Sequence, residues 1–223
     1  MGKVYYNHMR KLTVCLPFLG LGLVAAIPGA TQQPAWLKAA SLQSHEGMTI
    51  SAAPWTDARL YKEKFPKKSP YAAGVLAVHV AFRNDSDDSV KISLDRIRMS
   101  VLIDQDNRQE LAPLSAGELA DAVLKPGAKD PTKRRLPFPV PTGAPKTGKD
   151  KNWTELQTEA QNAAVPTSVA APHSTVQGLL YFDLQGQFDL LSTAHLYIPD
   201  ILVMQKNRSL TYFEIDLSRP GET

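Results

Sequence analysis

The stretch that decides the fold is Gly74-Val75-Leu76-Ala77-Val78-His79-Val80-Ala81-Phe82-Arg83. Successive side chains of an extended chain point to opposite faces, so every second residue shares a face. One face of this run carries four large apolar residues: Leu76, Val78, Val80 and Phe82. We therefore predict a strand with that face in a hydrophobic core. The opposite face is expected to point outward, and it carries Val75, Ala77, His79, Ala81 and Arg83.

A polar turn follows this strand. Residues 84–88 read Asn-Asp-Ser-Asp-Asp, and such short polar side chains bond to their own backbone in turns. Residues 90–94 alternate again and are predicted to form the partner strand of a hairpin. Residues 97–103 predict a third strand, which ends at the polar segment 104–107.

The remaining strand patterns are short and separated by turn signals. They cover residues 47–52, 175–184, 194–198, 201–204 and 210–217. The total of roughly seven or eight short strands, without the strand–helix–strand rhythm of a parallel sheet, is typical of an antiparallel sandwich. We therefore predict a mainly β fold, an antiparallel immunoglobulin-like β-sandwich with one or two short helices.

Two segments predict helices and three predict irregular chain. Ser115 with Glu118 three residues later forms a capping box, so a helix is expected over residues 116–124; residues 153–163 predict a second. Residues 31–46 are expected to be frayed or a short helix, and residues 54–73 an irregular connection. Residues 125–151 contain six prolines and three glycines and predict a long, exposed, Pro-rich loop.

The first 30 residues have the pattern of a secretory signal peptide. Lys3, Arg10 and Lys11 precede an apolar run that ends in small residues. The run is shorter than the roughly 20 residues of a membrane-spanning helix, although an uncleaved anchor is the alternative. Cys15 lies near the start of the run, which excludes a lipid-modified cysteine, and Met9 is a second candidate for the initiator. We expect an exported protein, periplasmic or secreted.

Three segments therefore make up the expected domain organisation. Residues 1–30 are the signal peptide, residues 31–73 an N-terminal segment with the first strand, and residues 74–223 the sandwich with its inserted loop 125–151. Removal of the signal removes three positive charges and the single cysteine. The rest of the chain then has 22 basic and 22 acidic residues and no thiol, which excludes thiol catalysis, cysteine-based zinc sites and iron–sulfur clusters.

This neutral total contains an uneven distribution of charge. The loop at 125–151 has eight basic and two acidic residues, and residues 57–68 have five and two. Export disfavours nucleic acid as the partner and favours an anionic lipid surface, an envelope polysaccharide or an acidic envelope protein. The alternative is that basic loops only maintain solubility and protect sheet edges. The predicted partner-binding residues are Lys129, Lys133, Arg134, Arg135, Lys146, Lys149 and Lys151.

The catalytic and metal-binding patterns in the chain are incomplete. Residues 143–149 match the G-x-x-x-x-G-K phosphate loop, but Asp150 stands where a serine or threonine should hold Mg²⁺. Residues 104–107 begin like a calcium loop without its later ligands, and the acids of the 84–88 turn are expected to be solvated. No two of the five histidines have metal-ligand spacing, His79 is expected at the surface, and no G-x-S-x-G elbow occurs.

These observations favour a protein without catalytic activity, cofactor or metal. We expect an exported binding or envelope accessory protein that contacts an anionic partner through its basic loop. Two alternatives stay open: an exported hydrolase or hydrolase accessory domain, which should have a concave pocket lined by acids or histidines, and a surface-assembly subunit, which should have an unpaired, apolar edge strand. The oligomeric state does not follow from the sequence.

The stretch from Gly74 to Ser86, followed by Val90-Lys91-Ile92, resembles the strand–N-x-S–strand core of bacterial exported immunoglobulin-like domains of the DUF4352 type. The resemblance covers about 30 residues and implies a β-sandwich attached to an envelope or secreted protein. The helix at 116–124 and the basic loop depart from that pattern. No site residue is carried over.

Overall fold

The computed structural model describes residues 40–104, 107–124 and 151–218. The predicted signal peptide and residues 125–150 of the basic loop lie outside the described residues. The described part belongs to one compact unit, residues 33–223. No helix in the described ranges is long and apolar enough to cross a membrane.

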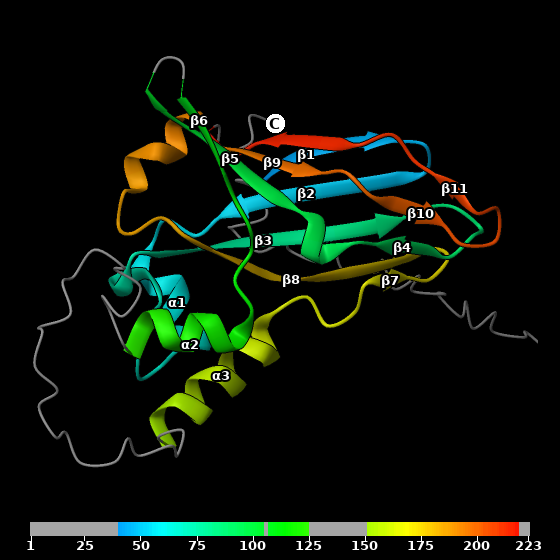
Figure 1. Ribbon diagram of the computed structural model, residues 1–223. Helices are drawn as coiled ribbons and strands as arrows, with labels where there is room; N and C mark the ends of the chain where they lie inside the picture. The colour runs from blue at the N-terminus through cyan, green and yellow to red at the C-terminus, as the bar shows by residue number, and fades with distance from the viewer. Residues whose placement is uncertain (1–39, 105–106, 125–150, 219–223) are drawn as a thin grey trace, which may run out of the picture. The chain divides into compact units, whose positions relative to one another are not determined.

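The first sheet is built around the stretch that begins at Gly74. It has four antiparallel strands in the order β1-β2-β3-β8 (Figure 1). Strand β3 is central and pairs with β8 over ten residues, from Val75 opposite Asp183 to Asn84 opposite Ser174. The bounds are β1 Ser41–His45, β2 Met48–Pro54, β3 Val75–Asn84 and β8 Ser174–Asp183.

Two further four-stranded sheets pack on one face of the first. The second sheet has the order β11-β10-β4-β7 and the third has the order β12-β9-β5-β6. Their bounds are β4 Val90–Ile92, β5 Arg98–Asp104, β6 Asn107–Leu111, β7 Val169–Ala170, β9 His195–Ile198, β10 Ile201–Val203, β11 Arg208–Ser209 and β12 Phe213–Asp216. Between the sheets lies a core that includes the predicted face of β3, Leu76, Val78, Val80 and Phe82, all without exposed surface. The predicted mainly β, antiparallel sandwich is confirmed.

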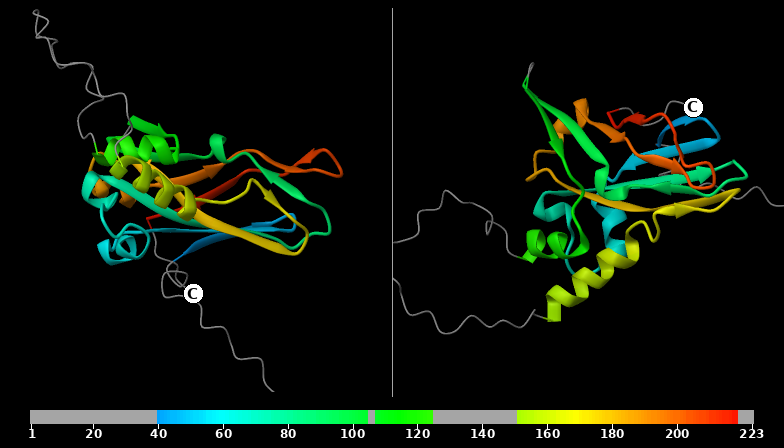
Figure 2. Two further views of the ribbon diagram at one scale, coloured as in Figure 1. Left: turned by 90° about the horizontal axis from the view of Figure 1, so that it is seen from below. Right: turned by 45° about the vertical axis from the view of Figure 1, so that its right-hand side comes forward.

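Three α-helices cover the other face of the first sheet near the start of β3 (Figure 2). They are α1 Ala58–Lys64, α2 Ala116–Leu124 and α3 Lys151–Ala163. Aromatic residues of α1 and β8, with Trp153 of α3, form a second core there. Val75, Ala77 and His79 are therefore buried, and the prediction that they point outward is wrong; Arg83 at the far end is exposed. The helices, which we call the helical layer, bury this face of β3, which would be exposed to water in a two-layer sandwich.

Both helices predicted from the sequence are present. The α2 capping box forms as predicted: Ser115 N donates to Glu118 Oε2 at 2.9 Å, and Glu118 N donates to Ser115 Oγ at 3.3 Å. Helix α3 begins at Lys151, two residues before its predicted start. Three short 3-10 helices complete the described elements: Tyr71–Ala73, Leu94–Arg96 and Phe188–Thr193.

Helix α1 corrects the prediction of an irregular connection over residues 54–73. Asp57 caps its N-terminus by accepting a hydrogen bond from Arg59 N at 2.8 Å. Tyr61 is fully buried; its hydroxyl donates to Trp55 O at 3.0 Å and accepts from Ala77 N at 2.8 Å. This buried hydroxyl holds the helix on β3 despite the neighbouring prolines and lysines.

Two other predictions from the sequence are corrected. Ser41–His45 is an edge strand instead of a frayed or helical segment, because all five of its residues pair with β2, from Ser41 opposite Ala52 to His45 opposite Met48. The segments β3 and β4 do not form a hairpin: β4 pairs with β10 and β7 in the second sheet. The 84–88 turn therefore carries the chain from one sheet to another.

Candidate binding surface

Only one of the seven predicted partner-binding residues lies in the described part of the chain. Lys151 is the first residue of α3, and its side chain is 87% exposed, with Nζ 3.9 Å from Glu155 Oε1. The other six lie outside the described residues: Lys129, Lys133, Arg134, Arg135, Lys146 and Lys149. The structure therefore describes the two helix ends that flank the basic segment, the C-terminus of α2 and the N-terminus of α3. We call these its anchor points.

Both anchor points belong to the helical layer. Residues 125–150 leave the C-terminus of α2 and enter the N-terminus of α3, and these helices pack together. The indole Nε1 of Trp153 donates to Asp121 Oδ1 at 2.9 Å, and the ring lies over Gly117, where a Cβ would be in ordinary contact with it at 3.7 Å. This packing holds the two ends of the basic segment on one layer of the fold.

The second basic stretch of the sequence lies on the same layer. Residues 57–68 form α1 and the chain after it, and all five basic side chains are exposed. Three of them form ion pairs: Arg59 with Asp57, Lys64 with Glu63, and Lys67 with Glu155 of α3. Lys62 and Lys68 form no ion pair with any carboxylate of the described residues.

The described part of the helical layer is neutral overall. Its basic residues are Arg59, Lys62, Lys64, Lys67, Lys68 and Lys151. Its acidic residues are Asp57, Glu63, Glu118, Asp121, Glu155 and Glu159. The positive excess therefore comes from residues 125–150, which have seven basic and two acidic residues. Acids from α2 and α3 offset the basic stretch at 57–68, which looked like a patch in the sequence.

His79 lies on the face of β3 that the helical layer covers. It is 9% exposed instead of being a surface residue. Burial, together with a smaller effect of the positive charge of Lys64, lowers the pKa of His79 from its ordinary 6.5 to about 4. The imidazole is therefore neutral in the folded protein at neutral pH.

We expect His79 to make the fold sensitive to acid. The unfolded chain binds a proton at this residue near pH 6.5 and the folded chain only near pH 4. The stabilisation is complete above pH 6.5 and is lost as the pH falls toward 4, by at most about 1.4 kcal/mol per pH unit. Urea unfolding from pH 7 to 4 should show this slope reduced in His79→Gln and kept in His173→Gln, an exposed control. An equal slope in both variants would contradict the assignment.

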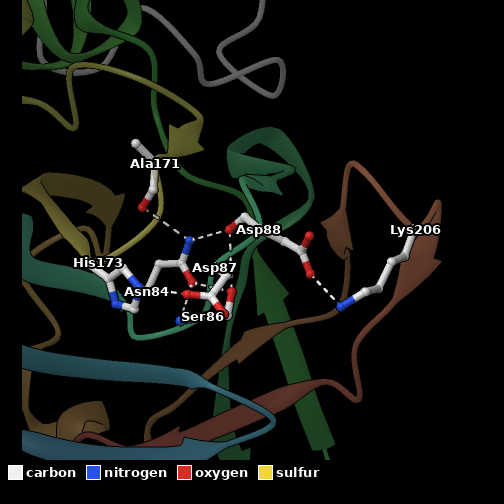
Figure 3. A network of polar contacts seen from close by, with 7 residues as sticks. All are labelled: Asn84, Ser86, Asp87, Asp88, Ala171, His173 and Lys206. Carbon is white, nitrogen blue, oxygen red and sulfur yellow. Dashed lines mark hydrogen bonds and ion pairs between the residues drawn. The ribbon is translucent and has the colours of Figure 1, made fainter.

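The acids of the 84–88 turn each contact a separate base. Asp85 pairs with Arg83 at 2.8 Å. Figure 3 shows the other two pairs, Asp87 with His173 at 2.8 Å and Asp88 with Lys206 at 2.6 Å. Across residues 40–104, 107–124 and 151–218, no three His, Cys, Asp or Glu side chains converge as metal ligands would. The residues of the phosphate-loop pattern before Lys151 and the middle of the 104–107 segment lie outside the described residues.

Asn84 holds the crossing between the sheets (Figure 3). Its amide Nδ2 faces three carbonyl oxygens, of Asp88 at 2.7 Å, Ala171 at 3.0 Å and Ala170 at 3.2 Å. Its Oδ1 accepts from Ser86 N at 3.0 Å and Ser86 Oγ at 2.7 Å. The side chain has no exposed surface, so this asparagine of an N-x-S triplet is structural in the folded protein.

The comparisons with known proteins leave the function open. No known family model matches the sequence, and no curated protein is significantly similar to it. A functionally unknown protein from Listeria monocytogenes EGD-e has a solved structure that is similar at 12% identity and a TM-score of 0.35. The match covers 78% of this chain and 79% of that one. A likeness this distant carries no argument about function.

Proposed function

We propose that the protein is an exported, non-catalytic accessory protein of the bacterial cell envelope that binds an anionic partner through the basic segment 125–151. Export is supported by the pattern of residues 1–30, with positive charges before a short apolar run. The thiol-free chain that follows is compatible with an oxidising compartment outside the cytoplasm.

The observation that carries the binding proposal is the anchoring of the basic segment. Both ends leave from packed helices, α2 and α3, which Trp153 and Asp121 join through a hydrogen bond. The segment between these two ends contains seven basic and two acidic residues. Concentrated charge of one sign attracts an opposite charge over several ångströms and raises its rate of association.

The partner that suits this arrangement has closely spaced negative charges. A polysaccharide with acidic groups or a surface of anionic lipids can contact several lysines and arginines at once. Each contact is weak when exposed, so affinity depends on their number and decreases as salt screens them. A strong salt dependence is therefore part of the proposal.

Neutralisation of the basic segment tests this function. The variant replaces Lys129, Lys133, Arg134, Arg135, Lys146 and Lys149 with glutamine. We expect at least about a tenfold loss of binding to vesicles containing phosphatidylglycerol or to an acidic polysaccharide at low salt. Sedimentation with vesicles and retention on immobilised polysaccharide measure the two partners separately.

Two triple variants serve as matched controls. Lys62, Lys64 and Lys68 lie on the helical layer, whereas Lys91, Lys206 and Arg208 lie on the second sheet or its turn. Changing the first set to glutamine should weaken binding severalfold. Changing the second set to glutamine should leave binding unchanged. Equal binding by the loop variant and the unaltered protein would refute the proposal. Equal losses of binding in the two control variants would show that the partner is attracted by the net charge of the protein alone.

A further inference from the structure

One edge of the sandwich is open. β6, Asn107–Leu111, is the terminal strand of the third sheet, and no other strand of the described residues pairs with its outer side. Asn107, Arg108, Gln109 and Glu110 are all exposed. Figure 1 and the right panel of Figure 2 show the β5–β6 hairpin projecting beyond the first sheet, so a second chain has access to this edge.

The other edges of the three sheets are short or covered. β1 and β12 lie side by side: Gln43 Oε1 accepts from Glu214 N at 2.8 Å, and Glu46 Oε2 accepts from Thr211 N at 2.7 Å. The outer side of β8 is bridged by Ala164 at Leu179. β7 and β11 have two residues each. β1 is as long as β6 and β8 is longer, but each of these has a contact on its outer side; among the described residues, β6 is the edge strand of more than two residues for which no such contact is seen.

The sequence of β6 is complementary to itself in one antiparallel register. If two copies pair with Gln109 opposite Gln109, then Arg108 of each chain lies opposite Glu110 of the other. Directly opposite residues share a face of the sheet, and opposite charges there stabilise the pairing, whereas like charges oppose it. A register centred on Arg108 or on Glu110 would instead place like charges face to face.

We propose that two copies of this chain associate through β6, in antiparallel register about Gln109, to form one continuous eight-stranded sheet. The two-fold axis passes between the paired Gln109 residues, so the interface uses the same patch on both copies. The backbone hydrogen bonds of the edge supply the attraction, and the two Arg108–Glu110 pairs select the register. A surface-assembly subunit would capture a different, apolar strand, whereas β6 is polar and fits a copy of itself.

Charge reversal at β6 tests the pairing. Sedimentation equilibrium of the purified protein should show a reversible dimer at concentrations up to about 100 µM. Arg108→Glu places like charges in both pairs and should weaken the dimer about tenfold or more. Glu110→Arg should do the same, and the double variant R108E/E110R should restore the dimer to within about threefold. Both altered side chains are exposed, so the melting temperature should stay unchanged at concentrations where the protein is monomeric.

A disulfide tests the register. Directly opposite residues of antiparallel strands have Cα atoms about 4.5 to 5.5 Å apart, which suits a disulfide. In a Cys15→Ser background, Gln109→Cys should form a cross-linked dimer under mild oxidation, and Arg108→Cys should cross-link at least about tenfold more slowly. A monomer at the highest concentration would overturn the proposal and identify Arg108 and Glu110 as charges that protect the edge. A dimer indifferent to the charge reversals, or equal cross-linking at 108 and 109, would overturn it as well.

Discussion

Asn84→Asp should lower the free energy of unfolding by about 4 kcal/mol. The two side chains have the same shape, so packing is preserved. The change replaces an amide donor that faces the carbonyls of Asp88, Ala170 and Ala171 with a carboxylate oxygen. A buried negative charge would then lie 2.7 to 3.2 Å from three carbonyl oxygens. Urea unfolding at pH 7 measures the loss.

Asn162→Asp is the control for this change. Asn162 is exposed in the last turn of α3, so the same substitution should cost less than about 1 kcal/mol. A protonated carboxyl group can donate one hydrogen bond, so the deficit of the Asn84 variant relative to the unaltered protein should shrink below pH 5 or so. A loss of stability that is small at pH 7, or independent of pH, would mean that the Asn84 amide does not stabilise the crossing between the sheets.

The same crossing between the sheets explains why the prediction of a hairpin between β3 and β4 was wrong. An Asn-x-Ser turn bonds to its own backbone whether the next strand returns to the same sheet or enters another. The choice is made by the carbonyls of Ala170 and Ala171, which are 86 and 87 residues away in the sequence. A contact so distant along the chain has no local pattern, so the turn was predictable and its destination was not.

The burial of β3 was predicted for one face only, although the stretch contains a signal for the second. Val75, Ala77 and Ala81 on the opposite face are apolar or small, and a nearly continuous apolar run indicates a strand covered on both sides. The alternation of large and small side chains along β3 was interpreted as an alternation of buried and exposed positions. His79 then appeared to belong to a solvent face, whereas the helices cover it.

The candidate binding surface was predictable in composition and less so in location. The excess of charge in residues 125–151 follows from counting residues, and the capping box fixes where α2 begins. Charge counting along residues 57–68 failed because Glu155, on a helix far along the sequence, pairs with Lys67 at 2.6 Å. Periodicity within a segment predicts an element, and only the packing of elements determines which charges neutralise each other.

Gly178→Ala should destabilise the fold by about 3 kcal/mol, because a methyl group at this position meets backbone atoms. Gly178 lies in β8 opposite Val80 of β3. A Cβ built on it would be 2.5 Å from Val165 N and 2.6 Å from Ala164 C and O. Flexible side chains can move aside at little cost, but these atoms belong to the chain that links α3 to β7. The melting temperature should fall by roughly 6 to 12 °C.

Gly117→Ala separates this steric effect from the general effect of replacing a glycine. Gly117 lies in the first turn of α2, and a Cβ there would make ordinary contact with the Trp153 ring at 3.7 Å. Alanine favours a helix over glycine by up to about 1 kcal/mol, so this variant should be as stable as the unaltered protein or more so. Opposite signs in the two variants are the expected result. If both were neutral, residues 164 and 165 would not be held against β8 as the bridge between Ala164 and Leu179 indicates.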